Sequence, residues 1–132
     1  MSEVYIQQSN NFEIQVVTSF DFQRSNPLRF HYMFKYKITI INLSDKTSQL
    51  ISRKWSIVDG QENVEFVEGP GVVGNQPLFR PKEKFTYQSF CPLSTRTGRM
   101  YGQYFMKDEH GDFFAIDTPV FYFKIPEELL SP

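Results

Sequence analysis

The 132-residue chain has little cysteine, little histidine and no long apolar run. Its single cysteine, Cys91, excludes an internal disulfide and supplies no cysteine pair for a metal site, which is typical of a reducing compartment. No stretch approaches the roughly 20 apolar residues of a transmembrane helix, so no membrane partner is expected. The first residues lack a basic segment followed by an apolar one, which predicts a cytoplasmic protein without a signal peptide.

Residues in catalytic patterns are also scarce. The two histidines, His31 and His110, fall in different predicted segments, and the chain has neither an H-E-x-x-H pair nor a G-x-S-x-G motif. The acidic residues are scattered, so no carboxylate pair is indicated for acid–base chemistry. We therefore predict a non-enzyme with no catalytic residues, no metal ligands and no cofactor. Weak binding of a divalent ion by the acidic side chains around Gly111 is a minor alternative.

The charge balance gives no sign of a nucleic-acid partner. Lysine and arginine total 14 against 15 acidic residues, a net charge of -1. Nucleic-acid-binding domains usually carry a basic excess or a basic stripe. The length predicts one domain with a sizeable core, followed by a short extended tail over about residues 126–132.

Aromatic residues are abundant, and their pattern favours strands. The chain has fourteen phenylalanines and seven tyrosines, residues enriched in β-structure. From Phe30 to Ile41, apolar and polar side chains alternate with a period of two. One face of this segment is predicted to enter the core: Phe30, Tyr32, Phe34, Tyr36, Ile38 and Ile40.

Turn signals separate this strand from several others. The further segments predicted as strands are residues 12–16, 48–58, 64–67, 85–91, 97–106 and 113–123. Asp59-Gly60 predicts a hairpin, and Thr118-Pro119 predicts a bulge or an edge position. Seven to eight short antiparallel strands predict an all-β sandwich, with a small barrel as the alternative.

A glycine-rich segment with the spacing G-x-G-x-x-G is formed by Gly69, Gly71 and Gly74. In a dinucleotide-binding fold a helix must follow this motif, but Pro77 and Pro81 exclude a regular helix here. A tight surface loop is the structural interpretation. The functional alternatives are protein docking and a phosphate or pyrophosphate cradle of backbone N–H groups. In the cradle, charge would come from the side chains Arg80 and Lys82.

A second group of residues suggests protein recognition. Arg53 and Trp55 share one face of a predicted strand, and these residue types dominate interaction hot spots. A core tryptophan covered by the arginine stem is the structural alternative. Val72 and Val73 are adjacent apolar residues in the glycine loop, which are costly at an exposed tip unless something covers them. These four residues and Phe90 form a predicted contact set. The partner would be an unidentified protein or a second copy of the chain in a homodimer.

Five motifs in register resemble the ApaG family over about residues 3 to 125. They are Ser52-Arg53-x-Trp55, Gly69-Pro70-Gly71-Val72-Val73-Gly74-x-Gln76-Pro77, Tyr87-x-Ser89-x-Cys91-Pro92-Leu93, Gly102-x-Tyr104-x-Met106 and Asp108-x-x-Gly111. Two positions depart from the family pattern: Lys54 stands where histidine is common, and Phe90 where glycine is usual.

The resemblance implies a single ApaG-like domain over residues 1–132, in the stand-alone bacterial form. The implied fold is an immunoglobulin-like or fibronectin type III-like β-sandwich. The family name is attached to cobalt and magnesium efflux, and related domains in eukaryotic F-box proteins imply protein recognition. Because fold alone does not determine function, these remain expectations.

Overall fold

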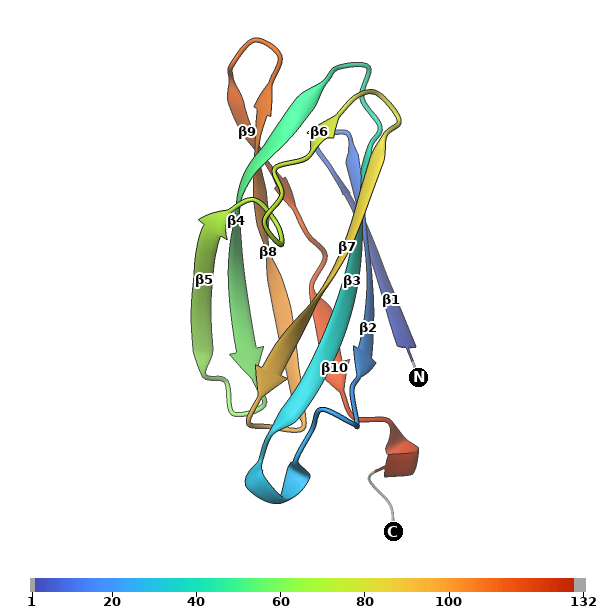
Figure 1. Cartoon of the computed structure of the whole chain (residues 1–132), viewed down its shortest axis with the longest axis vertical. Helices are drawn as coiled ribbons and strands as arrows, with labels where there is room; N and C mark the ends of the chain where they lie inside the picture. The colour runs from blue at the N-terminus through green and yellow to red at the C-terminus, as the bar shows by residue number, and fades with distance from the viewer. Residues whose placement is uncertain (1, 130–132) are drawn as a thin grey trace.

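The computed structural model describes residues 2–129, which form ten β-strands and two short 3-10 helices (Figure 1). The strands are β1 (Ser2–Ser9), β2 (Phe12–Phe20), β3 (Tyr32–Asn42), β4 (Ser48–Asp59), β5 (Val64–Pro70), β6 (Leu78–Phe79), β7 (Lys84–Leu93), β8 (Thr97–Asp108), β9 (Phe113–Asp117) and β10 (Phe121–Lys124). The helices are η1 (Pro27–Arg29) and η2 (Glu127–Leu129). Within the predicted tail, residues 127–129 form the single turn η2, and residues 130–132 lie outside the described residues.

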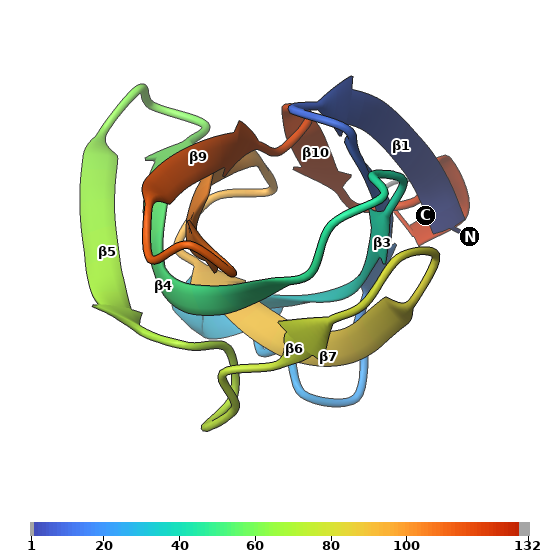
Figure 2. The same ribbon diagram turned by 90° about the horizontal axis from the view of Figure 1, so that it is seen from above.

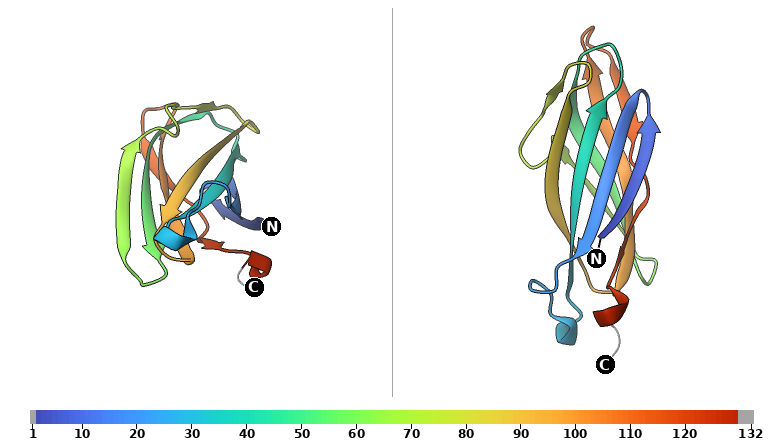
Figure 3. Two further views of the ribbon diagram at one scale, coloured as in Figure 1. Left: turned by 60° about the horizontal axis from the view of Figure 1, so that its bottom comes forward. Right: turned by 90° about the vertical axis from the view of Figure 1, so that its right-hand side faces the viewer.

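Two antiparallel sheets pack face to face and confirm the all-β sandwich. One sheet has the order β1-β2-β3-β7 (Figure 3, right). The other has the order β10-β8-β4-β5, with β6 also paired to β4 and β9 to β8. The described residues form more strands than the seven to eight expected, because β1 and β6 were not predicted. The predicted strand 113–123 is also divided at Thr118-Pro119 into β9 and β10.

The core lies between the two sheets, which surround it when the molecule is seen from above (Figure 2). Strict alternation on β2 and β3 buries every second side chain, as the period of two predicted. Aromatic rings dominate this interior. Trp55 makes edge-to-face contacts with Tyr104 and Phe121, and Phe34 stacks on Phe123. Such packing holds the two sheets together through apolar burial and ring geometry.

Phe30 is a correction to the predicted core face. β3 begins at Tyr32, and Phe30 instead ends helix η1 in the left-handed region with a φ of 53°. Its N–H donates to the Pro27 carbonyl, and its side chain is 70% exposed. Pro27 explains the difference, because its fixed φ starts a helical turn that alternation alone does not reveal.

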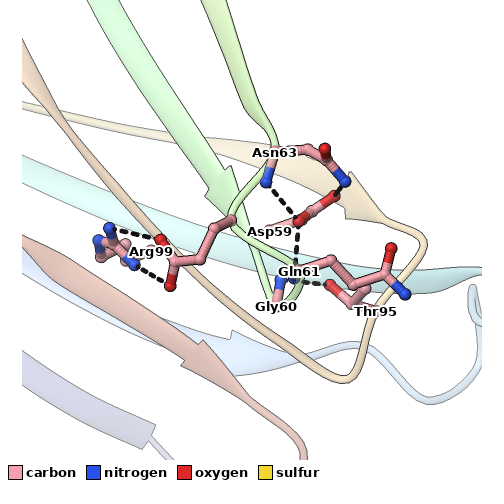
Figure 4. A network of polar contacts seen from close by, with 7 residues as sticks. Asp59, Gly60, Gln61, Asn63, Thr95 and Arg99 are labelled. Atoms are coloured by element: carbon pink, nitrogen blue, oxygen red, sulfur yellow. Dashed lines mark hydrogen bonds and ion pairs between the residues drawn. The ribbon is translucent and has the colours of Figure 1, made fainter.

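Polar contacts hold the β4–β5 hairpin in place (Figure 4). The Asp59 carboxylate accepts hydrogen bonds from the Gln61 and Asn63 N–H groups and from the Asn63 side-chain amide. The Gly60 N–H donates to the Thr95 hydroxyl in the neighbouring turn. An ion pair joins Arg99 and Glu62 at 3.1 Å. Gly60 and Glu62 thereby tie the turn to the β7–β8 connection and to β8, and the Asp59 contacts order the turn before β5.

These contacts predict a specific acid sensitivity. The N–H of Asn63 is the largest of the contacts that lower the pKa of Asp59. A carboxyl group whose pKa is lower in the folded than in the unfolded chain stabilises the fold at pH values above its unfolded pKa. This stabilisation is lost as the pH falls through the pKa of the folded state. We expect the Asp59→Asn variant to lose less stability than the unaltered protein between about pH 5 and pH 2 in urea titrations. Equal losses in the two proteins would contradict this assignment.

Candidate functional site

A groove of about 580 Å³ opens between the two sheets, where β5 ends one sheet and β7 ends the other. One wall carries the inward-facing side chains of β4 and β5, including Arg53 and Glu65. The opposite wall is β7, with Tyr87, Ser89 and Cys91. The glycine loop contributes to the lining as well. The groove therefore lies on the side of the sandwich where the edge strands β5 and β7 are not paired with each other.

Two buried tyrosines, Tyr36 and Tyr87, line the groove, and Tyr104 is hydrogen-bonded to Tyr87 in the core. The hydroxyls of Tyr87 and Tyr104 lie 2.6 Å apart in a buried hydrogen bond that joins the two sheets. Burial is the main cause that raises the pKa of Tyr36, Tyr87 and Tyr104. All three phenols therefore stay neutral near neutral pH and act as hydrogen-bonding groups rather than as bases.

Cys91 lies in the same wall as a buried thiol, 3% exposed. Burial, with a smaller contribution from the Glu65 carboxylate, raises its pKa to about 12. The reactive thiolate is therefore scarce at neutral pH. This environment is typical of a structural thiol rather than of a reactive one.

The glycine loop is attached to β4 at a bulge. The register of β4 against β8 shifts between Leu50 and Ser52. The freed carbonyl of Ile51 accepts hydrogen bonds from the Gly71 N–H at 2.8 Å and from the Gln76 side-chain amide at 2.9 Å. Gly71 itself has a φ of 60°, and a Cβ there would overlap the Asn75 carbonyl oxygen. Glycine is required at position 71 for both conformation and space.

Arg53 explains the first glycine of the motif. Its Nη1 donates to the carbonyls of Pro70 and Gly71, both at 3.1 Å. The guanidinium lies over Gly69, where an added Cβ would be only 2.8 Å from Nη1. The arginine motif on β4 and the glycine motif on β5 are thus linked by packing, because Gly69 leaves room for the Arg53 side chain.

A tight turn forms the tip of the loop. Val72 and Asn75 exchange two backbone hydrogen bonds, at 2.8 and 2.9 Å, around Val73 and Gly74. Both central residues have positive φ, 41° for Val73 and 82° for Gly74, as in a type I′ turn. Val72 is buried, whereas Val73 is 55% exposed. A β-branched residue in this conformation is strained, since type I′ turns favour asparagine at that position.

The structure brings together the whole predicted contact set. Arg53, Trp55, Val72, Val73 and Phe90 all line the groove, although they come from three separate segments. Trp55 and Val72 are buried in the core and offer a partner almost no surface, which corrects their assignment as direct contacts. Arg53, Val73 and Phe90 keep accessible surface.

The predicted anion set is not assembled in the same way. Gly69 is paired within β5, and the N–H groups of Gly71 and Val72 are already donated within the protein. The exposed Arg80 side chain forms an ion pair with Glu83 at 3.8 Å. Lys82 is exposed, and neither cation lines the groove. A cradle of successive free amides over residues 69–72 is therefore not present.

Sequence reasoning missed the polar members of the groove. The bond between Tyr87 and Tyr104 depends on how the two sheets pack, which no single strand pattern records. Glu65 was predicted only as part of a short return strand. The visible signal was the regular placement of Tyr87, Ser89 and Cys91 on one face of β7.

Two further findings concern other site types. Within residues 2–129, no group of three or more His, Cys, Asp or Glu side chains could hold a metal ion. Neither η1 nor η2, the helices of the described chain, has the length and apolar character of a membrane span.

Comparisons with known proteins agree with the motif pattern. The ApaG domain model matches residues 22–108. Protein ApaG of Mesorhizobium japonicum is 45% identical over 118 residues, covering 89% of this chain and 91% of that protein. Protein ApaG of Bdellovibrio bacteriovorus is 42% identical over 116 residues, covering 88% and 91%. The crystal structure of an ApaA protein from Bordetella pertussis superposes with a TM-score of 0.83, at 36% identity and with 96% of each chain covered. The chain belongs to the ApaG family.

Proposed function

We propose that this ApaG-family chain is a non-enzymatic docking module that binds a partner protein at the groove between β5 and β7. The observation that carries the proposal is the conformation of Val73. An exposed β-branched residue with a φ of 41° is unfavourable both for the backbone and for solvation. Strain of this kind is found where a side chain is retained for contact rather than for stability.

The surroundings of Val73 fit protein contact. Val64 on β5 and Phe90 on β7 line the same groove and are 49% and 39% exposed. The Arg24 guanidinium lies 5.1 Å from the centre of the Phe90 ring, so this aromatic is held in place while still accessible. Arg53 adds a half-buried cation to a groove that mixes apolar and aromatic side chains with the carboxylates of Asp59 and Glu65. Aromatic, apolar and arginine side chains are the types that dominate binding hot spots.

The chemistry of the groove supports a role without catalysis. Its phenols and its thiol have raised pKa values, and the residues that line it include no histidine. A general base or an activated nucleophile would require the opposite shift. Pyrophosphate binding by the amides of Gly71 and Val72 would require groups that are already donated to Ile51 and Asn75.

A contribution to cobalt or magnesium homeostasis would be exerted through the partner in this proposal. In this proposal the metal ion is bound by the partner protein rather than by this chain. The cytoplasm is the compartment that we propose, because a single buried thiol is suited to reducing conditions.

The Val73→Asn variant tests the docking proposal. Asparagine suits a type I′ turn, so we expect the free energy of unfolding to rise by about 0.5–1 kcal/mol. Loss of the apolar tip should weaken partner binding about tenfold, a hot-spot effect of roughly 1.4 kcal/mol. Tagged protein would be used to capture partners from its own cell, with quantification by mass spectrometry.

The matched control is the Val4→Asn variant. Val4 is 61% exposed on β1, at the far edge of the four-stranded sheet from β7. A partner should be retained by the unaltered protein and by Val4→Asn, and lost with Val73→Asn. If all three proteins retain the same set of partners, the groove is not the docking site.

A further inference from the structure

The free edge of β5 carries an unused set of hydrogen-bonding groups. β5 pairs only with β4 and ends its sheet. The Asp59 N–H donates to the Asn63 carbonyl at the hairpin, and hydrogen-bonded pairs alternate along an antiparallel ladder. The backbone N–H and C=O groups of Val64, Phe66 and Glu68 therefore point away from β4. Figure 2 shows β5 at the outer rim of the sandwich.

This edge lacks several of the features that usually prevent strand pairing, and its charged side chains are the two glutamates Glu65 and Glu68. From residue 64 to residue 69, β5 has no proline and no lysine or arginine. Its register with β4 runs without a bulge, and Phe66 is 68% exposed beside the edge. The free edge of β7, by contrast, includes Lys84 and Pro92. Prolines, lysines and bulges are the common means by which proteins protect an edge, so β5 is open to another strand.

We propose that β5 pairs with β5 of a second copy of this chain, antiparallel and with Phe66 opposite Phe66 on a twofold axis. In this register Val64 lies opposite Glu68, and Glu65 lies opposite Val67 of the other copy. All outward-pointing groups of Val64, Phe66 and Glu68 then find partners. The two aromatic rings meet on one face, and no two like charges are directly opposed, as stable cross-strand pairing requires.

Neighbouring registers are less favourable. A twofold axis at residue 65 places two Glu65 carboxylates directly opposite each other, which is destabilising. An axis at residue 67 places Val64 opposite Pro70, which has no N–H to donate. The sequence of this edge therefore selects one self-pairing register, which is the argument for a second copy over an unrelated strand.

The contact is small, so the expected dimer is weak and concentration-dependent. A single strand edge is well below the roughly 800 Å² per partner of a standard stable interface. The pairing does not depend on the proposed docking function, since it uses the backbone of β5 rather than Val73. An edge accepts one strand at a time, so a partner strand at β5 would compete with the second copy.

Oxidative cross-linking of the Phe66→Cys variant tests the register. Opposed residues of a hydrogen-bonded pair lie about 5.5 Å apart at Cα, within the range of a disulfide. Cys91 is buried and has a raised pKa of about 12, so it does not compete with an exposed thiol. We expect a covalent dimer to form at least tenfold faster than in the Val64→Cys variant.

The Val64→Cys variant is the matched control. The two copies of residue 64 would be offset by four positions, or roughly 13 Å along the strand, which is too far for a disulfide. A mixture of Val64→Cys and Glu68→Cys chains should cross-link with each other. Equal rates for Phe66→Cys and Val64→Cys, or no cross-linking of Phe66→Cys in a protein that also sediments as a monomer at high concentration, would overturn the proposal.

Discussion

Replacing Gly71 by alanine should lower the free energy of unfolding by roughly 2–4 kcal/mol. Two costs add at this position. The φ of 60° is unfavourable for any residue with a Cβ, and the new methyl group would overlap the Asn75 carbonyl oxygen. Relief would require the loop to move away from β4, which would break the bond from the Gly71 N–H to the Ile51 carbonyl. Urea unfolding measured by fluorescence of the buried Trp55 gives the value.

Gly74→Ala is the matched control. Gly74 also has positive φ, 82°, but an added Cβ would meet nothing within 4 Å. Its cost should be limited to the backbone term of about 1 kcal/mol. A Gly71→Ala variant no less stable than Gly74→Ala would show that the loop is not fixed against Asn75 and Ile51.

The second large effect concerns the hydrogen bond between the two sheets. Tyr87→Phe should lower the free energy of unfolding by about 1–3 kcal/mol, because it leaves the Tyr104 hydroxyl buried without a partner. Tyr104 is 0% exposed, so its own hydroxyl has no contact with solvent that could compensate. Thermal or urea unfolding of the purified variant measures this cost.

The reverse substitution should cost less. In Tyr104→Phe the remaining hydroxyl belongs to Tyr87, which lines the groove and can meet water there. In the double variant no phenol is left unpaired, so its cost should be smaller than the sum of the two single costs. Additive costs, or a larger cost for Tyr104→Phe than for Tyr87→Phe, would contradict the placement of this pair.

Periodicity predicted much of the fold. Strands β2, β3 and β4 carry the clearest alternation and turn signals, and they form the centre of the two sheets. β1 was missed because most of its side chains are exposed, so no buried stripe marks it. β6 has only two residues and is defined by its pairing with β4, which a local pattern does not show.

The glycine motif illustrates what sequence alone leaves open. Spacing indicated a loop, and Pro77 excluded the helix of a nucleotide site. The physical reason for Gly69 appears only when the Arg53 guanidinium is found above it. A similar relationship holds between Gly102 and Trp55, since a Cβ on Gly102 would lie 2.7 Å from the indole ring. Contacts between paired strands join motifs that are far apart along the chain.

The same limit applies to the candidate site. Residue types selected Arg53, Val73 and Phe90, and the structure places all three at one groove. Residue types also selected Trp55 and Val72, which are core residues. The exposure of a side chain depends on where its strand lies in the sandwich. The sequence could therefore select these residues but could not separate the exposed ones from the core ones.

The central claim is that the glycine loop is a fixed support for an exposed docking tip and not an anion cradle. Amide NMR with pyrophosphate tests it most directly. We predict that the amides of Gly71, Val72 and Asn75 are protected from hydrogen exchange and show no saturable shift at millimolar pyrophosphate, because each is donated within the protein. Saturable shifts of these amides, together with a change in their protection, would contradict the claim.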